Sequence, residues 1–193
     1  MAISKGNIKV GKIPNVSLPP VIACGNHGYC KNDCYAMRSY KQYNQVRKSW
    51  QENYNLAIKS HEIYFSMIDS FLWKHKPRMF RWHVSGDILS QKYLGGMVQV
   101  ALNNPEIKFL AFTKMFKFDY SGCPENLAVV FSMWPGMKRP RFKKGVSGFY
   151  WMQDGTEKRV PHGALECFGH CDNCGMCWNL KNLDIPHIRN HKH

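Results

Sequence analysis

The chain has 193 residues, of which 44% are hydrophobic, so it should fold around a core rather than stay disordered. Lys and Arg number 27 against 13 Asp and Glu, which gives a net charge of +14. No apolar run reaches the roughly 18 residues of a membrane span, and the N-terminus lacks an apolar segment of signal-peptide length. We therefore expect a cytoplasmic protein with no membrane contact, and the charge favours nucleic acid as a partner.

The predicted elements follow one another in the order of an α/β protein. Residues 1–23 contain three prolines and should be extended, whereas residues 34–74 lack Pro and Gly and predict two helices, or one helix broken near Ser60. Strands are expected at 78–84, 107–113 and 127–133, with a helix at 91–103. This alternation predicts a small open parallel sheet, a partial half-barrel, with helices and cysteine-rich loops.

We expect a single domain, 1–193, with three parts. Residues 14–134 form the α/β core with an N-terminal cysteine loop, 135–163 a basic and aromatic segment, and 164–180 a C-terminal cysteine loop. Within the middle part, residues 148–152 read as a strand, one side of a hairpin that turns at Asp154 and Gly155. The polar tail that follows the second loop is expected to fray.

Seven of the eight cysteines fall in two short runs among Gly, Asn, His, Asp and Lys. In a reducing compartment such clustering indicates metal ligands rather than disulfides. Cys123 stands alone and reads as a core residue, or as a further ligand for the first run. The first run is spaced C-x5-C-x3-C and the second C-x3-C-x2-C-x2-C; their members are Cys24, Cys30 and Cys34, then Cys167, Cys171, Cys174 and Cys177.

The spacing of the second run favours an iron–sulfur cluster over zinc. C-x2-C-x2-C is the pattern that wraps a cubane in bacterial ferredoxins, whereas structural zinc usually takes ligand pairs from separated places. Four thiols can close one [4Fe-4S] cluster, and three leave an iron open to a substrate or cofactor. The sequence predicts one or two clusters. A single cubane shared by both runs and zinc in both loops remain alternatives.

A candidate ligand site follows the first two strands. Ser85, Gly86 and Asp87 lie beyond the end of one strand and Lys114 beyond the end of the next, where parallel sheets bind ligands. Asp87 either contributes to that site or caps the helix at 91–103. Lys114 suits a phosphate or a carboxylate. Basic residues for nucleic-acid phosphates, with Phe142, Tyr150 and Trp151 to stack on bases, are Lys31, Arg38, Lys41, Arg47, Lys48 and the basic members of 138–144.

Three motifs together resemble the phage "gene product 88" family: Cys34-Tyr-Ala36, Arg81-Trp-His-Val-Ser-Gly-Asp87 and Cys174-Gly-Met-Cys-Trp178. That family usually reads RWHDSGD at the second motif, and the likeness covers roughly residues 14–178. More distantly, the chain is similar to radical SAM proteins, which bind a cluster after the first strand and S-adenosylmethionine at a Gly-Gly-Glu-like turn after the second. Their usual spacing, C-x3-C-x2-C, differs from that of the first run here.

The resemblance implies a reduced radical-SAM-like half-barrel in which Ser85, Gly86 and Asp87 hold S-adenosylmethionine and Asp87 is catalytic. Lys114 is expected to join the same cofactor site because of its place beyond the next strand. Our first hypothesis is a phage-type iron–sulfur protein, in the host cytoplasm, that acts on or binds nucleic acid. The alternative is a basic module without enzymatic activity, stapled by a cluster or by zinc, that binds nucleic acid or a host protein.

Overall fold

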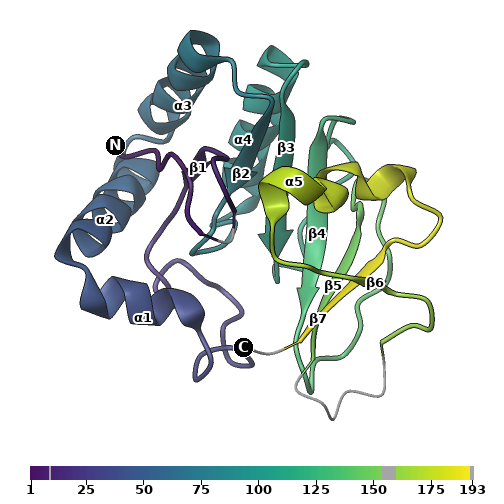
Figure 1. The fold of residues 1–193 in the computed structure, drawn as a ribbon. Coiled ribbons are helices and arrows are strands. Elements are labelled where there is room, and N and C mark those ends of the chain that lie inside the picture. The colour runs from purple at the N-terminus through teal and green to yellow at the C-terminus, as the bar shows by residue number, and fades with distance from the viewer. Residues whose placement is uncertain (9, 154–159, 192–193) are drawn as a thin grey trace.

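A computed structural model describes residues 1–8, 10–153 and 160–191 of the chain. Seven strands form one open sheet, every adjacent pair of which is parallel, in the order β1-β2-β3-β4-β5-β7-β6 (Figure 1). The α/β class and the open parallel sheet are therefore confirmed. The strands are β1 Asn15–Val16, β2 Met79–Trp82, β3 Lys108–Thr113, β4 Leu127–Met133, β5 Gly148–Gln153, β6 Leu165–Glu166 and β7 His187–His191.

The sheet is wider than the three or four strands that the sequence predicts. The tail was expected to fray, but it forms β7, which lies between β5 and β6 and buries Ile188. Most of its side chains are polar, so the sequence shows no strand pattern there, and the strand is held mainly by backbone hydrogen bonds to its neighbours. The predicted hairpin after β5 is also wrong, because β5 has the parallel neighbours β4 and β7. The proposed turn at Asp154 and Gly155 lies outside the described residues.

Three helices occupy the segment predicted to hold two. The predicted break at Ser60 is confirmed, because Ser60 has φ −145° and ψ 65° and separates α2 from α3. A further break falls at Tyr43. The helices are α1 Tyr35–Gln42, α2 Asn44–Lys59, α3 His61–His75, α4 Gln91–Asn103 and the short α5 Cys171–Cys174, with a 3-10 helix, η1, at Met176–Asn182. No helix in the described part of the chain is long and apolar enough to cross a bilayer.

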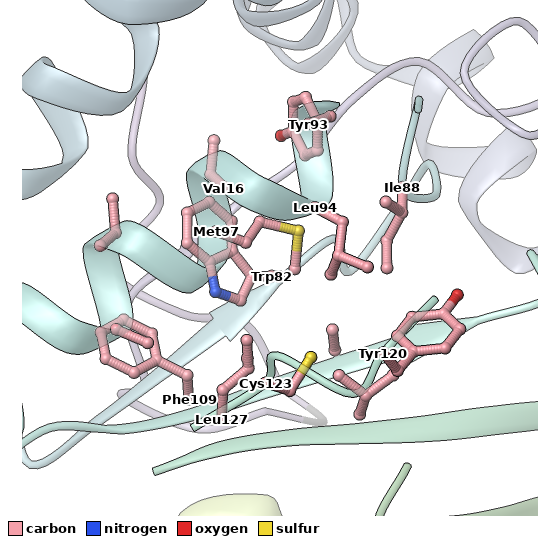
Figure 2. Packing of buried hydrophobic residues seen from close by; sticks show 14 of the residues in the cluster. Val16, Trp82, Ile88, Tyr93, Leu94, Met97, Phe109, Tyr120, Cys123 and Leu127 are labelled. Carbon is pink, nitrogen blue, oxygen red and sulfur yellow. The ribbon is translucent and has the colours of Figure 1, made fainter. Parts of the chain in front are cut away.

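One face of the sheet packs against α3 and α4. Figure 2 shows Met97 of α4 beside Trp82 of β2, and Tyr93 and Leu94 of the same helix belong to the same buried cluster. Cys123 lies in the same core, among large apolar side chains. This confirms the reading of Cys123 as a core residue, and burial raises the pKa of its thiol to about 11.

The other face of the sheet packs against the two ends of the chain. Its buried residues include Leu110, Val130 and Tyr150 from the strands, and η1 adds Trp178 and Leu180. The Trp178 indole donates a hydrogen bond of 3.2 Å to the carbonyl oxygen of Phe80 in β2, which fastens the C-terminal loop to the sheet. The second cysteine run is thereby brought onto the face opposite the helices (Figure 1).

Candidate functional site

The first cysteine run forms a loop over the carboxyl ends of the strands, and we call Cys24, Cys30 and Cys34 the edge group. The loop is held from both sides. Gly25 lies against the Met115 side chain, beyond β3, and the Tyr29 ring is 3.6 Å from where a Cβ on Gly136, beyond β4, would lie. The Cys30 thiol adds to the raised pKa of Cys24, and the Cys34 thiol adds to that of Cys30, so the three lie near one another.

The predicted site residues Asp87 and Lys114 meet beside the edge group. Burial raises the pKa of Cys24 to about 11, while the Lys114 ammonium acts in the opposite direction. Burial also raises the pKa of Cys30, again opposed by Lys114. For Lys114 itself, burial is outweighed by Asp87, Cys30 and Cys24, so its pKa is raised and it stays charged. A fixed cation therefore faces two of the three thiols.

Asp87 is a hub of hydrogen bonds at this edge. Its Oδ1 accepts from the Thr113 hydroxyl at 2.6 Å and from its neighbour's amide, Ile88 N, at 2.7 Å. Its Oδ2 accepts from the Lys114 amide at 2.9 Å. The residue is 1% exposed, and burial raises the pKa of its carboxyl despite Lys114 and these donors. Asp87 does not cap α4, because Ser90 holds that position and accepts from Tyr93 N.

The motif around Asp87 carries backbone strain and unpaired polar atoms. His83 has φ 53° and Gly86 φ 90°, and only glycine adopts such values at little cost. Burial lowers the pKa of His83 to about 3, so its ring is neutral and meets the Tyr93 hydroxyl at 3.0 Å. Among the described residues, four buried side-chain atoms of this motif have no hydrogen-bond partner: Arg81 Nε, Trp82 Nε1, His83 Nδ1 and Ser85 Oγ.

The second run forms a separate cluster of thiols, and we call Cys167, Cys171, Cys174 and Cys177 the face group. Burial raises the pKa of the Cys177 thiol, and the thiols of Cys167, Cys171 and Cys174 raise it further. The four thiols thus lie near one another on the face of the sheet opposite α3 and α4, which we call the open face. Gly175, at φ 60°, ends α5 and turns the chain into η1 between the third and fourth thiols.

Arg81 and Tyr150, on the sheet beneath the face group, complete its surroundings. The Arg81 guanidinium lies over the Phe112 ring, 4.8 Å from its centroid, and acts on Cys177. The hydroxyl of Tyr150 shares a hydrogen bond with the Cys167 thiol, and burial together with the cysteines raises its pKa. Arg81 also acts on Tyr35, whose hydroxyl donates to the carbonyl oxygen of Val84 beside the edge group.

The two cysteine groups therefore occupy different places, one beyond the strand ends and one on the open face. All eight cysteines are free thiols. Across the described ranges, no three His, Cys, Asp or Glu side chains are close enough to enclose one metal ion. The sequence indicated both groups from spacing alone. From the sequence, Tyr150 was expected to stack on nucleic-acid bases. Arg81 stood out in the sequence only as a charged residue within an aromatic strand.

The predicted basic residues are mostly exposed, but two of the three predicted stacking residues are not available. Tyr150 and Trp151 are buried in β5, at 8% and 3% exposed, because both faces of this strand are covered. Phe142 is 54% exposed. Arg139 is exposed too but lies over the Phe149 and Trp151 rings. The other exposed residues of the predicted set, which we call the basic surface, are Lys31, Arg38, Lys41, Arg47, Lys48, Lys138, Arg141 and Lys144.

Comparison with known proteins agrees with the motifs. The family model described as "Gene product 88" matches residues 2–138, which include the edge group and the Arg81–Asp87 motif. The "Gene 88 protein" of Mycobacterium phage L5 is 26% identical over 206 residues, covering 90% of this chain and 86% of that protein. No solved structure shows a significant match. Since the family model spans well over half of the chain, the chain belongs to the Gene product 88 family.

Proposed function

We propose that this chain is an iron–sulfur protein that holds one [4Fe-4S] cluster at the edge group and another at the face group. The observation that carries the proposal is that each group of thiols has its own cation, the partly buried Lys114 for the edge group and the buried Arg81 for the face group. A cubane bound by thiolates is an anion, so a neighbouring cation stabilises it. The edge-group thiols lie in a loop and its end, and three of the face-group thiols lie on the short helices α5 and η1, so binding would draw each group together around its metal.

Iron and sulfide quantitation on anaerobically purified protein tests this proposal. Two clusters give about eight iron atoms per chain. A variant with the three edge-group cysteines changed to Ala, or one with the four face-group cysteines changed, should each keep about four. Cys123→Ala is the matched control and should keep all of them. Folded wild-type protein that is colourless and iron-poor would overturn the proposal, and stoichiometric zinc would favour the zinc alternative.

The three thiols of the edge group would leave one iron of their cluster without a protein ligand. S-adenosylmethionine is the candidate ligand that the resemblance implies, and the cluster would supply the electron for its reductive cleavage. Both Asp87 oxygens already accept hydrogen bonds from the chain, so we propose that Asp87 positions Lys114 and the edge loop. Assay of 5′-deoxyadenosine after anaerobic reduction with dithionite tests cleavage, and absence of product with an intact cluster argues against it.

Nucleic acid is the partner that we propose, with a host protein as the alternative. What supports it is that the contact of Tyr29 with Gly136 brings the cysteine loop beside residues 138–144, so that cations from both segments share one edge. Tyr29 and Phe142 are 50% and 54% exposed there and can stack on bases. Arg139 instead covers the Phe149 ring and Lys143 bonds to Phe118 O, so these two serve packing.

The test is the salt dependence of binding to a fluorescent single-stranded oligonucleotide. Lys31→Gln with Arg141→Gln should reduce the slope of log K against log salt by about 1.4, or 0.7 for each lost phosphate contact. Lys59→Gln, at the far end of α2, is the matched control and should leave the slope unchanged. No binding at low salt, or equal effects of both variants, would contradict the proposal.

A further inference from the structure

Arg81 is a buried cation that forms no ion pair with a carboxylate in the described part of the chain. It is 8% exposed and lies on β2, the second strand from one edge of the sheet. Its flat guanidinium is stacked on Phe112, which fixes its place on the open face. The ion pairs within the described ranges join Lys181 to Glu125 and Arg189 to Glu166, so neither involves Arg81. Its Nε also lacks a hydrogen-bond partner there.

A guanidinium in such a position needs an anion. Arginine stays charged at any ordinary pH, so it cannot avoid the cost of burial by losing its proton. A buried charge with no partner destabilises the folded state strongly. The Phe112 ring beneath Arg81 lies 4.9 Å from the Tyr150 ring, and Phe112 packs against the same apolar cluster as Cys167, Cys171 and Cys177 of the face group.

We infer that Arg81 is the counter-ion of the cluster held by the face group, and that it raises the reduction potential of that cluster. The inference rests on the proposed function. A cluster on four thiolates becomes more negative by one charge when it takes up an electron, so a nearby fixed cation favours the reduced state. Lys114 lies beside the edge group and serves the other cluster.

Potentiometric titration under anaerobic conditions tests the inference. The measurement uses a full-length variant in which Ala replaces the three edge-group cysteines. The EPR signal of its reduced state then comes from the face-group cluster. In this background Arg81→Met should shift the potential to more negative values with the iron content unchanged. Arg81→Lys should recover part of the shift, because it restores the charge. Lys114→Met is the matched control, since it removes a cation that belongs to the other group, and should cause no shift.

Two results would overturn the inference. One is an unchanged potential in Arg81→Met with iron bound, and the other is an equal shift in Lys114→Met. If Arg81→Met loses its iron, Arg81→Lys decides: retention of iron supports a requirement for charge, and loss in both variants refutes it.

A second measurement separates this inference from the proposed function. In iron-free protein the guanidinium has no counter-ion, so Arg81→Met should raise the melting temperature above that of iron-free wild type. An unchanged or lower melting temperature would show that Arg81 has another anion, and would overturn the inference even if iron binds. A raised melting temperature in a protein that never binds iron would support a need for an anion and would refute the proposed function alone.

Discussion

Replacement of Asp87 tests whether one carboxylate organises the carboxyl edge of the sheet. Its oxygens accept hydrogen bonds of 2.6, 2.7 and 2.9 Å from donors on Thr113, Ile88 and Lys114. In Asp87→Ala all three donors lose their acceptor in a place that water does not reach. Each buried donor left unpaired costs about 1–3 kcal/mol, so we expect a loss of about 3–5 kcal/mol after some local relaxation.

Urea unfolding of iron-free protein measures this loss, with tryptophan fluorescence as the signal because Trp82 is fully buried. Asp87→Asn keeps one acceptor oxygen and should lose about 1–2 kcal/mol. Thr113→Val removes the hydroxyl, and the double variant should show a coupling of about 1 kcal/mol. If Asp87→Ala unfolds within about 1 kcal/mol of wild type, the hydrogen-bond reasoning is refuted and a direct catalytic role regains support.

The other predictions concern pH, backbone strain and the face group. The pKa of His83 is about 3 in the folded protein and higher in the unfolded chain, so the neutral ring contributes its full stability above pH ~6.5. As the pH drops from there towards 3, the free energy of unfolding should fall by about 1.4 kcal/mol per pH unit. Urea unfolding at pH 6 and pH 4 should show a smaller loss of stability in His83→Gln than in wild type. Gly86→Ala, at φ 90°, should cost about 2–3 kcal/mol in the same assay, whereas Gly122→Ala, with nothing within 4 Å, should be neutral; equal effects would refute the strain argument. Tyr150→Phe removes a hydroxyl from Cys167, so the potential of the face-group cluster should become more negative at unchanged iron content, and an unchanged potential would contradict this.

The elements that the sequence predicted well are those with a strong local pattern. β4 is an unbroken apolar run, as expected for a parallel strand covered on both faces, and its bounds match the prediction. α4 also matches, because Ser90 caps its start and Asn104 ends it. β7 was missed because most of its side chains are polar and its order depends on backbone bonds to β5 and β6, which no local pattern reveals.

The same limit applies to the candidate site. Cysteine spacing is a local property, so both groups of thiols could be found from the sequence. The partners of each group come from distant strands. Lys114 follows β3 but acts on Cys24, and Tyr150 of β5 bonds to Cys167. Whether Asp87 is free to react depends on which amides face it, which only the folded backbone decides.

The surplus of positive charge therefore has two parts with different physical properties. Arg81 is buried and Lys114 is largely covered, so salt should screen them little, whereas the basic surface faces solvent and should be screened strongly. Raising the salt from about 50 to 200 mM should then weaken nucleic-acid binding steeply and leave both reduction potentials nearly unchanged. If the potentials instead followed the salt as closely as the affinity does, the cations that act on the clusters would be the exposed ones, and the roles given to Arg81 and Lys114 would be wrong.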